Sequence, residues 1–304
     1  MKKDLLSLND LNSDEVHFLL KEAVRLKADR HGGSSVLKDK ILALIFQKPS
    51  NRTRVSFEVG IHQLGGKCLY LGPGEISLGK RESTADVAAT LSRYLDGIVA
   101  RTFKHEDIVE LSRTASIPII NGLSDLYHPC QALADLMSIR EKFSELKGLK
   151  LAYIGDGNNV CHSLMLGCAK VGMQVTVATP PGYEPSSEIF NMAQKEAKHF
   201  NASVTMTHVP HEAAQGADVI YTDVWASMGQ EEEHDARVKI FHDFQINSAL
   251  ISKAHDNCIF MHCLPAHRGE EVTAEVIDGP HSIVFDQAEN RLHMQKAILL
   301  FIFS

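Results

Sequence analysis

The chain has 304 residues, of which 44% are hydrophobic and 23% charged, and its formal net charge at pH 7 is -7. This composition is that of an ordinary globular protein, and the length favours two domains over one. The negative charge disfavours nucleic-acid binding, because proteins that bind nucleic acids are generally basic. Any site for an anion must therefore be built locally, against the overall sign of the charge.

The six cysteines and sixteen histidines form no familiar metal or disulfide pattern. The sequence contains no C-x-x-C pair and no H-E-x-x-H motif, so we predict no metal site. Scattered cysteines fit a reducing compartment, and the opening segment MKKDLLSLNDLNSDEV lacks the apolar run of a signal peptide. We therefore expect a cytoplasmic protein that has no contact with a membrane.

Short apolar segments alternate with helical patterns through the first half of the chain. Ser13 is expected to cap the first helix. Strands are predicted at 41–46, 67–71, 97–101 and 117–120, and helices at 13–30, 52–65, 83–94 and 105–115, followed by a long helix at 129–146.

The alternation then restarts, with strands predicted at 150–155, 174–178, 203–207, 218–222, 258–262 and 282–285, and helices at 160–171, 186–199 and 286–302. Such alternation is typical of parallel sheets with helices on both faces. We predict an α/β fold with two doubly wound parallel-sheet domains, residues 1–135 and 136–289, joined by the long helix. The C-terminal helix, about 290–304, is expected to pack back on the first domain, and the active site to lie in the cleft between the domains.

The segment QKPSNRTR follows the first predicted strand and leads into a helix. Ser50 or Asn51 can cap this helix, which begins near Arg52. A helix start offers free amides and a positive dipole end, and an arginine fork adds bidentate recognition of phosphate or carboxylate. Arg54 lies beside the apolar face on a helical wheel, so Arg52 receives the ligand role and Arg54 a structural one. An isolated S-x-R-T-R pattern also suits a solvated helix start.

Two further strand ends carry polar side chains. Arg101 ends the third strand, and His128 and Gln131 flank the start of the long helix, where Pro129 suits the first helical position. Ligands bind at the carboxyl ends of strands in open parallel sheets. These donors are therefore expected to gather around a small oxyanion that carries a carbonyl to polarise.

In the second half, the segment GDGNNV resembles a dinucleotide-binding turn, but Val160 stands where a third glycine belongs. The next strand ends without the acid that would hold a ribose, so a nicotinamide-dependent dehydrogenase is disfavoured. Asn159, at a helix start, is a candidate polar ligand. Asp223 ends another strand, and its charge suits a cationic amine.

Four other residues are candidates with weaker signals. Ser227 and Met228 lie in a glycine-containing turn that suits a lid. Cys263 follows a strand, but without an evident base it is not predicted to be a nucleophile. Arg291 lies near the start of the last helix, against the dipole preference, which indicates a ligand or interdomain role.

Four motifs, in chain order, resemble the carbamoyltransferases of the aspartate/ornithine superfamily. They are SNRTR at 50–54, HPCQALADL at 128–136, DVWASMGQ at 223–230 and HCLP at 262–265. The first two are typical of the superfamily and the last two of its ornithine branch. The resemblance implies that the carbamoyl group of carbamoyl phosphate is transferred to the δ-amine of L-ornithine, giving L-citrulline and phosphate. No metal or organic cofactor is expected, because this substrate is already activated.

The resemblance also implies roles for individual residues. Arg101, His128 and Cys263 are the expected catalytic residues. Ornithine is expected to contact Asn159, Asp223, Ser227 and Met228. Carbamoyl phosphate is expected to contact Ser50, Asn51, Arg52, Thr53, Arg101, His128, Gln131, Cys263, Leu264 and Arg291.

A homotrimer is implied as well, in which the 73–82 loop, with Ser77, completes the site of a neighbour. Asn51 and Ser77 depart from the family pattern, which has Thr at the first position and often Gln at the second. Arginine biosynthesis is favoured over arginine catabolism. Putrescine or an N-acylornithine remains an alternative acceptor, and a solute-binding protein without catalysis is a more distant alternative.

Overall fold

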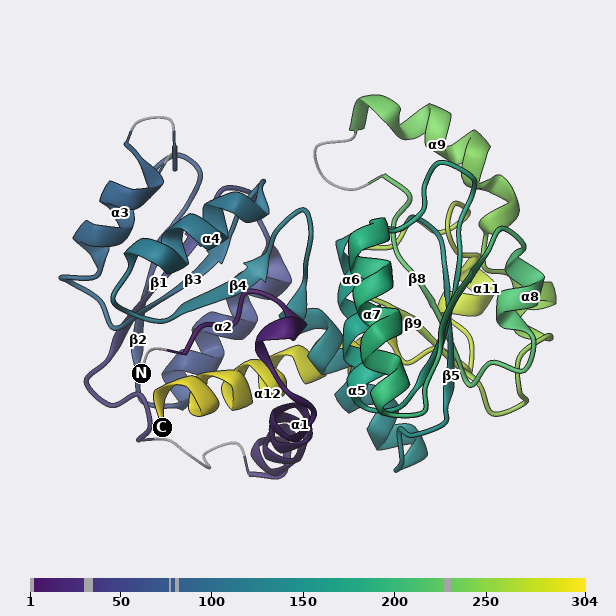
Figure 1. Cartoon of the computed structure of the whole chain (residues 1–304), viewed down its shortest axis with the longest axis horizontal. Coiled ribbons are helices and arrows are strands. Elements are labelled where there is room, and N and C mark those ends of the chain that lie inside the picture. The colour runs from purple at the N-terminus through teal and green to yellow at the C-terminus, as the bar shows by residue number, and fades with distance from the viewer. Residues whose placement is uncertain (1–2, 30–34, 77, 80–81, 227–230) are drawn as a thin grey trace. The chain divides into compact units, whose positions relative to one another are not determined.

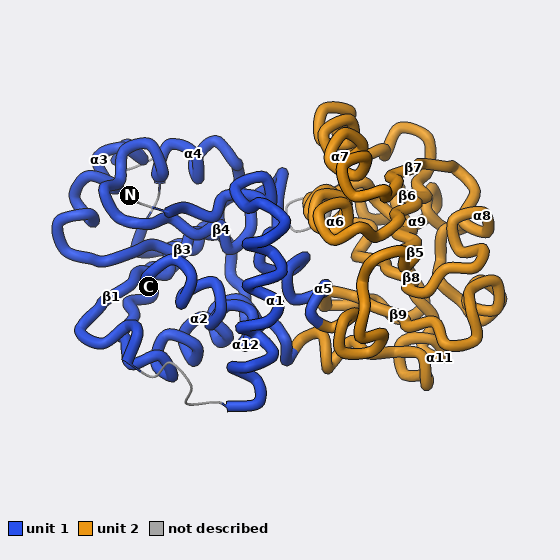
Figure 2. Tube along the Cα trace, turned by 60° about the horizontal axis from the view of Figure 1, so that its bottom comes forward, with its two compact units in different colours: residues 1–137, 289–304 blue, residues 138–288 orange. Residues whose placement is uncertain are grey.

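The computed structural model describes residues 3–29, 35–76, 78–79, 82–226 and 231–304. The chain forms two compact units, shown in Figure 2: unit 1 comprises residues 1–137 and 289–304, and unit 2 comprises residues 138–288. Each unit is built on one parallel sheet with helices, so the predicted α/β fold with two parallel-sheet units is confirmed. The helix α5 (Pro129–Phe143) contains the boundary between the units.

Unit 1 has a four-stranded sheet with the order β2-β1-β3-β4. The strands are β1 (Ile41–Phe46), β2 (Lys67–Leu71), β3 (Gly97–Arg101) and β4 (Ile119–Leu123), and all neighbours pair in parallel. The central strands β1 and β3 are almost fully buried, whereas the edge strand β2 is partly exposed. Runs such as ILALIF fit this position, because a strand covered on both faces is apolar throughout.

The helices of unit 1 are α1 (Ser13–Ala28), α2 (Asn51–Gln63), α3 (Thr84–Leu91), α4 (His105–Thr114) and, from the end of the chain, α12 (Val284–Phe303). Figure 1 shows α12 running alongside α2 and α1. A Cβ at Gly60 would lie 3.3 Å from Lys296 Cγ, so the glycine allows α2 to pack closely against α12. Phe18 and Phe301 meet with ring centroids 6.0 Å apart, which packs α1 against the same helix.

Unit 2 has a five-stranded parallel sheet with the order β7-β6-β5-β8-β9. Its strands are β5 (Lys150–Ile154), β6 (Gln174–Ala178), β7 (Val204–Thr207), β8 (Val219–Thr222) and β9 (Ile259–His262), and its helices are α6 (Asn159–Lys170), α7 (Ser187–His199), α8 (Pro210–Ala214), α9 (His234–Phe241), α10 (Ser248–Ile251) and α11 (Ala274–Ile277). Helices α6 and α7 lie side by side in Figure 1. Residues of α8, α9, α10 and α11 share one apolar core with β5, β8 and β9.

Several local expectations were wrong. The helix α1 is capped by Asn12, whose side chain accepts from Glu15 N–H while Glu15 reaches back to Asn12 N–H, so Ser13 is already helical. Residues 282–285 form no strand, because Ser282 makes a single bridge to Phe260 and α12 starts at Val284. None of the helices that the structure describes combines the length and apolarity needed to cross a membrane.

Candidate active site

The strand order of unit 1 brings three of the predicted segments to the same edge of its sheet. β3 lies between β1 and β4, with Arg101 paired to Phe46 on one side and to Leu123 on the other. The segment after β1 carries the start of α2, and the segment after β4 leads to His128 at the start of α5. Parallel strands place their carboxyl ends together, so these side chains occupy one region of unit 1.

The start of α2 is capped by Ser50. Its backbone is extended and its Oγ accepts a hydrogen bond from Thr53 N at 3.4 Å, while Asn51 is the first helical residue. Arg54 contacts Glu58 Oε2 at 3.4 Å and its guanidinium lies 3.8 Å from the centroid of the Tyr70 ring. These contacts are structural, in agreement with the sequence interpretation that separated Arg54 from Arg52.

Arg291 joins three helices of unit 1. From α12 it donates to Gln131 Oε1 on α5 at 2.5 Å and to Thr53 Oγ1 on α2 at 3.3 Å. Gln131 Nε2 in turn donates to Asp135 Oδ1 at 2.8 Å. All four side chains are buried, so the guanidinium is fixed by neutral groups next to the capped start of α2.

His128 lies close to Arg291, Arg101 and Arg52, which together form the basic cluster of unit 1. Burial, followed by the charges of Arg291, Arg101 and Arg52, lowers the pKa of His128 well below its ordinary value. The imidazole is therefore neutral at pH 7. A neutral imidazole can still donate one hydrogen bond, which is what a carbonyl oxygen requires.

Positive charge exceeds negative charge in the interior of unit 1. Among its described residues, the fully or nearly fully buried charged side chains are Arg101, Arg291, Lys296 and the carboxylate Asp135. Arg291 brings one of these charges to the start of α2 through its hydrogen bond to Thr53, which favours the binding of an anion there.

The same arrangement recurs in unit 2. β8 lies between β5 and β9, with Tyr221 paired to Tyr153 and Thr222 paired to His262. The segments that follow these strands carry Asn158, Asp223 and Cys263.

Asp223 is the centre of the cluster in unit 2. Its Oδ1 accepts from Val224 N at 2.8 Å and from Cys263 Sγ at 2.9 Å, and its Oδ2 accepts from Asn158 Nδ2 at 2.8 Å. The side chain is buried, so its negative charge is oriented by neutral donors. Cys263 thus has a carboxylate partner, which the sequence interpretation did not anticipate.

Asn158 supports this cluster but was not among the residues predicted from the sequence. The sequence interpretation selected Asn159, which is the first residue of α6, whereas Asn158 caps that helix through hydrogen bonds from Val160 N at 3.0 Å and Cys161 N at 3.2 Å. The same side chain holds Asp223. The two adjacent asparagines were the available signal, because asparagine is a preferred cap.

His262 and Glu271 form a buried pair that no sequence pattern indicated. His262 Nδ1 accepts from Leu264 N at 2.9 Å, so its Nε2 carries the proton and donates to Glu271 Oε1 at 3.2 Å. Both side chains are fully buried. The pair orients the turn that presents Cys263 and Leu264.

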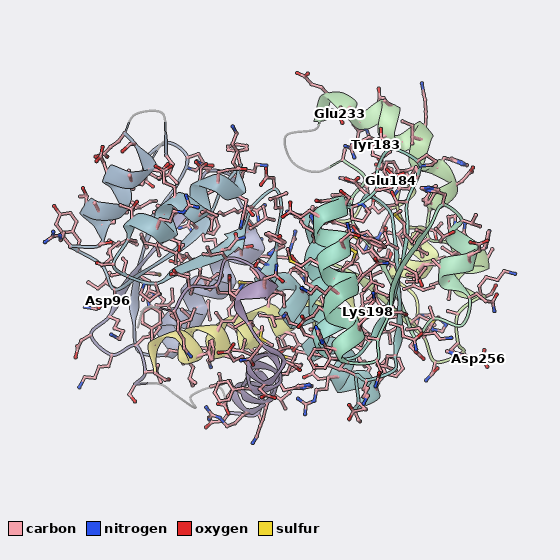
Figure 3. All side chains as sticks on the ribbon, viewed as in Figure 1. Asp96, Tyr183, Glu184, Lys198, Glu233 and Asp256 are labelled. Atoms are coloured by element: carbon pink, nitrogen blue, oxygen red, sulfur yellow. The ribbon has the colours of Figure 1, made fainter. Side chains whose placement is uncertain are left out.

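Arg237 holds the segment that follows β8. It donates to Trp225 O at 2.8 Å, to Asp156 Oδ2 at 3.1 Å and to Glu233 Oε2 at 2.9 Å. Tyr183, labelled with Glu233 in Figure 3, lies under the guanidinium, with its centroid 4.9 Å away. Burial raises the pKa of Asp156 to about 6 against the opposing influence of Arg237.

Three predicted site residues, Ser77, Ser227 and Met228, lie outside the described residues. The others divide between the two units. Ser50, Asn51, Arg52, Thr53, Arg101, His128, Gln131 and Arg291 belong to unit 1, and Asn159, Asp223, Cys263 and Leu264 belong to unit 2.

Comparison with known proteins gives a consistent result for both halves of the chain. Residues 3–141 match the carbamoyl-P binding domain, and residues 147–302 match the Asp/Orn binding domain, of the aspartate/ornithine carbamoyltransferases. The chain is 56% identical over 299 residues to an ornithine carbamoyltransferase of Carboxydothermus hydrogenoformans, covering 98% of this chain and 96% of that protein. It is 54% identical to one of Bacillus subtilis, covering 98% and 92%.

Solved structures agree with this. The ornithine carbamoyltransferase of Pyrococcus furiosus superposes with a TM-score of 0.96 at 52% identity, covering 99% of this chain and 97% of that chain. The enzyme of Gloeobacter violaceus superposes with a TM-score of 0.91 at 47% identity, covering 100% and 99%. These similarities extend over almost the whole sequence.

Proposed function

The chain belongs to the aspartate/ornithine carbamoyltransferase family, and we propose that it transfers the carbamoyl group of carbamoyl phosphate to the δ-amine of L-ornithine. The products are L-citrulline and phosphate. One observation carries this proposal: a buried basic cluster lies in the half that matches the carbamoyl-P binding domain, and buried Asp223 lies in the half that matches the Asp/Orn binding domain. Relatives at 54–56% identity over nearly the full chain support ornithine as the acceptor.

Carbamoyl phosphate binds to unit 1 in this proposal. Its phosphate lies at the start of α2, where it contacts the backbone amides and the side chains of Ser50, Asn51, Arg52 and Thr53. A phosphate at a capped helix start, beside an arginine fork, gains both dipole attraction and directed hydrogen bonds. Gln131 and Arg291 complete this set, and their mutual hydrogen bond keeps them in place before the substrate arrives.

Ornithine binds to unit 2 in this proposal. Asp223 receives the α-amino group, and Asn159, Ser227 and Met228 contact the remaining polar groups of the amino acid. Cys263 and Leu264 lie at the reacting centre. The support for Asp223 is its buried negative charge, which is oriented by Asn158 and by Val224 N–H and therefore needs no rearrangement to receive a cation.

The transfer itself needs no group beyond these side chains. Arg101 and the neutral His128 donate to the carbamoyl oxygen, which draws electron density away from the carbamoyl carbon. The unprotonated δ-amine attacks that carbon and forms the new C–N bond. The bond between the carbamoyl carbon and the phosphate oxygen then breaks, phosphate leaves with the bond electrons, and the attacking nitrogen passes one proton to the leaving phosphate. Arg52 and the α2 amides stabilise the charge of the leaving phosphate.

We extend the proposal in three ways from the family resemblance. The chain works in arginine biosynthesis rather than catabolism, it is cytoplasmic, and it assembles as a homotrimer in which the 73–82 loop of each copy reaches the site of a neighbour. Sedimentation or light scattering of the purified chain tests the trimer directly. A monomer with full activity would contradict the shared site.

The assay that tests the function measures carbamoylated product from carbamoyl phosphate with four acceptors compared: L-ornithine, putrescine, N-acetylornithine and L-aspartate. We expect L-ornithine to have the highest kcat/KM, because Asp223 favours a cationic acceptor over an acidic one. A preference for putrescine or N-acetylornithine would show that L-ornithine is not the acceptor, while carbamoyl transfer would still be the reaction. Activity with none of the four would overturn the proposed function.

A further inference from the structure

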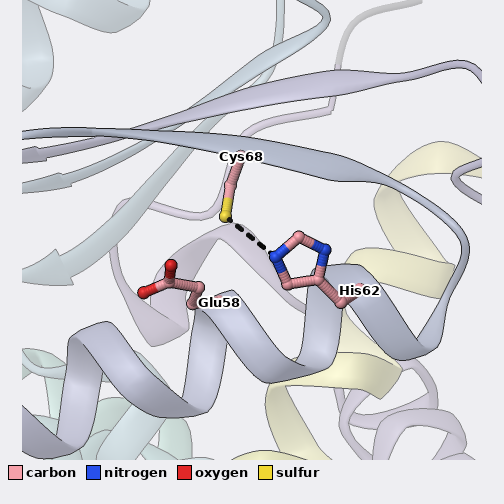
Figure 4. Close-up of side chains that lie close together, drawn as sticks. All are labelled: Glu58, His62 and Cys68. Atoms are coloured by element: carbon pink, nitrogen blue, oxygen red, sulfur yellow. Dashed lines mark hydrogen bonds between the residues drawn. The ribbon is translucent and has the colours of Figure 1, made fainter.

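A cluster of three metal-ligand side chains lies on unit 1, away from the start of α2. Glu58 and His62 are four residues apart on α2, and Cys68 lies on β2. One ligand atom from each residue lies within 4.8 Å of the other two, and Cys68 Sγ is 4.0 Å from His62 Nε2. Figure 4 shows the thiol, the imidazole and the carboxylate converging from the helix and the strand.

The backbone fixes this convergence. Side chains four residues apart share one face of a helix, so Glu58 and His62 lie side by side. The turn from α2 into β2 uses Gly65 at φ +85° and Gly66, where a Cβ would lie 2.9 Å from Leu37 Cβ. This tight turn, possible with glycine, returns the chain along α2 and brings Cys68 opposite the last turn of the helix.

We propose that Glu58, His62 and Cys68 bind a thiophilic divalent cation, with Zn²⁺ as the best match. Thiolate, imidazole and carboxylate are the ligand types that zinc takes in proteins, at roughly 2.3, 2.0 and 2.1 Å. Tetrahedral bonds of these lengths place sulfur and nitrogen roughly 3.5 Å apart, close to the 4.0 Å that separates them here. Small side-chain rotations therefore suffice, and His62 is exposed enough for water to supply a fourth ligand.

The contact between Arg54 and Glu58 is the alternative use of this carboxylate. The two atoms are 3.4 Å apart and the side chains are 43% and 37% exposed, so the pair is well solvated and contributes little. Arg54 also packs on the Tyr70 ring, which leaves it a partner when the carboxylate turns towards a cation. The ion pair is thus compatible with the proposed site.

This cation has a structural role and is separate from the transfer reaction. It ties the last turn of α2 to the edge strand β2 within unit 1, and none of its three ligands belongs to the residues assigned above to either substrate. The proposal therefore stands or falls independently of the proposed function. A bound cation should stabilise the chain against heat without being needed for turnover.

The experiment uses the full chain, stripped of metal by a chelator, with Zn²⁺ and Co²⁺ as probes. We expect one Zn²⁺ per chain at this site by elemental analysis after gel filtration, and a sulfur-to-cobalt charge-transfer band with Co²⁺. Cys68→Ser should remove that band, and His62→Ala and Glu58→Gln should each weaken Zn²⁺ binding by at least roughly tenfold, since even indirect partners of a metal contribute that much. Turnover of metal-free chain should equal that of the Zn²⁺ form.

Two controls separate this site from other thiols. Cys258 also lies near an imidazole, with its Sγ 3.7 Å from His281 Nδ1, but forms no three-ligand group among the described residues. Cys258→Ser should leave the cobalt band and Zn²⁺ affinity unchanged. Cys263, with Asp223 and His262, forms a second candidate group, so Cys263→Ser is measured alongside. A cobalt band that survives in Cys68→Ser and disappears in Cys263→Ser overturns the proposal, as does Zn²⁺ affinity unaffected by all three ligand substitutions.

Discussion

In unit 1 the polar side chains at the strand ends come from the segments after β1, β3 and β4, and in unit 2 they come from the segments after β5, β8 and β9. Both sets use the carboxyl ends of three adjacent parallel strands. The chemistry differs: the first set is basic, with Arg101 and Arg291 buried, and the second is centred on buried Asp223. The same topology therefore serves opposite charges.

The two sets have a common way of holding those charges. Arg291 donates to a hydroxyl and to an amide oxygen, and Asp223 accepts from an amide, a thiol and a backbone N–H. Hydrogen bonds to neutral groups orient a charge without cancelling it. Each set is therefore prepared for a ligand of the opposite sign before that ligand binds.

Neutralising Asp223 should produce the largest effect. Removing one partner of a desolvated charge pair typically costs about 2–5 kcal/mol, which corresponds to roughly 30- to several-thousand-fold in kcat/KM for ornithine in Asp223→Asn. Affinity for carbamoyl phosphate, measured by calorimetry, should change little, because the groups proposed to hold its phosphate lie in unit 1. Putrescine has no α-amino group, so activity with putrescine should fall less. An equal loss with both acceptors would show that Asp223 does not contact the α-amino group.

Replacing Arg52 by lysine should give the next largest effect, and this substitution tests the basic set of unit 1. The substitution keeps the charge but loses the fork, so kcat/KM should fall by about 100-fold while the fold survives. Circular dichroism and thermal midpoint report the fold. Arg54→Lys is the matched control on the same helix, and its activity should stay within a few-fold. Near-normal turnover in Arg52→Lys would remove Arg52 from the phosphate site.

The sequence predicted the positions of both sets well, for a physical reason. Apolar runs such as ILALIF identify strands, and ligands bind where parallel strands end, so Arg52, Arg101 and Asp223 could be selected by their place after a strand. Within unit 1, the strand order then brought the segments that carry Arg52 and Arg101 to the same edge of the sheet. The order β2-β1-β3-β4 itself was not readable, because pairing between strands depends on contacts distant in sequence.

The sequence did not predict the side chains that hold each set in place. Asn158 caps α6 and holds Asp223, but two adjacent asparagines at a helix start do not show which of them is the cap. Glu271 pairs with His262 through a turn whose geometry has no periodic signature. The segment SIVF at 282–285 fits a strand as well as the start of a buried helix, because three apolar residues are too few to show a period.

A smaller effect is expected in the pH dependence of stability, and it comes from Asp156 in unit 2. Burial raises the pKa of Asp156 to about 6 from 3.8, so the folded state favours the protonated carboxyl. Its stabilising contribution is full below pH 4 and is lost as pH rises through 6, by up to about 3 kcal/mol at 1.36 kcal/mol per unit. The difference in unfolding free energy between the wild type and Asp156→Asn should move by this amount between pH 4 and 7.

The smallest effect concerns His128, whose pKa is lowered well below its ordinary value by burial and by the surrounding arginines. An imidazole with an unshifted pKa, near ~6.5, would be largely protonated at pH 6 and neutral at pH 8, and would add a charge to the phosphate site at the lower pH. The dissociation constant of carbamoyl phosphate should instead show the same pH dependence in the wild type and in His128→Asn, within about twofold, since both lack a charge at this position. Calorimetry at pH 6, 7 and 8 and fixed ionic strength measures this, and titration of the ligand itself cancels in the comparison. Affinity that weakens several-fold with rising pH in the wild type but not in His128→Asn would mean that the imidazole is charged at the lower pH. The basic set of unit 1 would then include His128 as a cation rather than as a neutral donor to the carbamoyl oxygen.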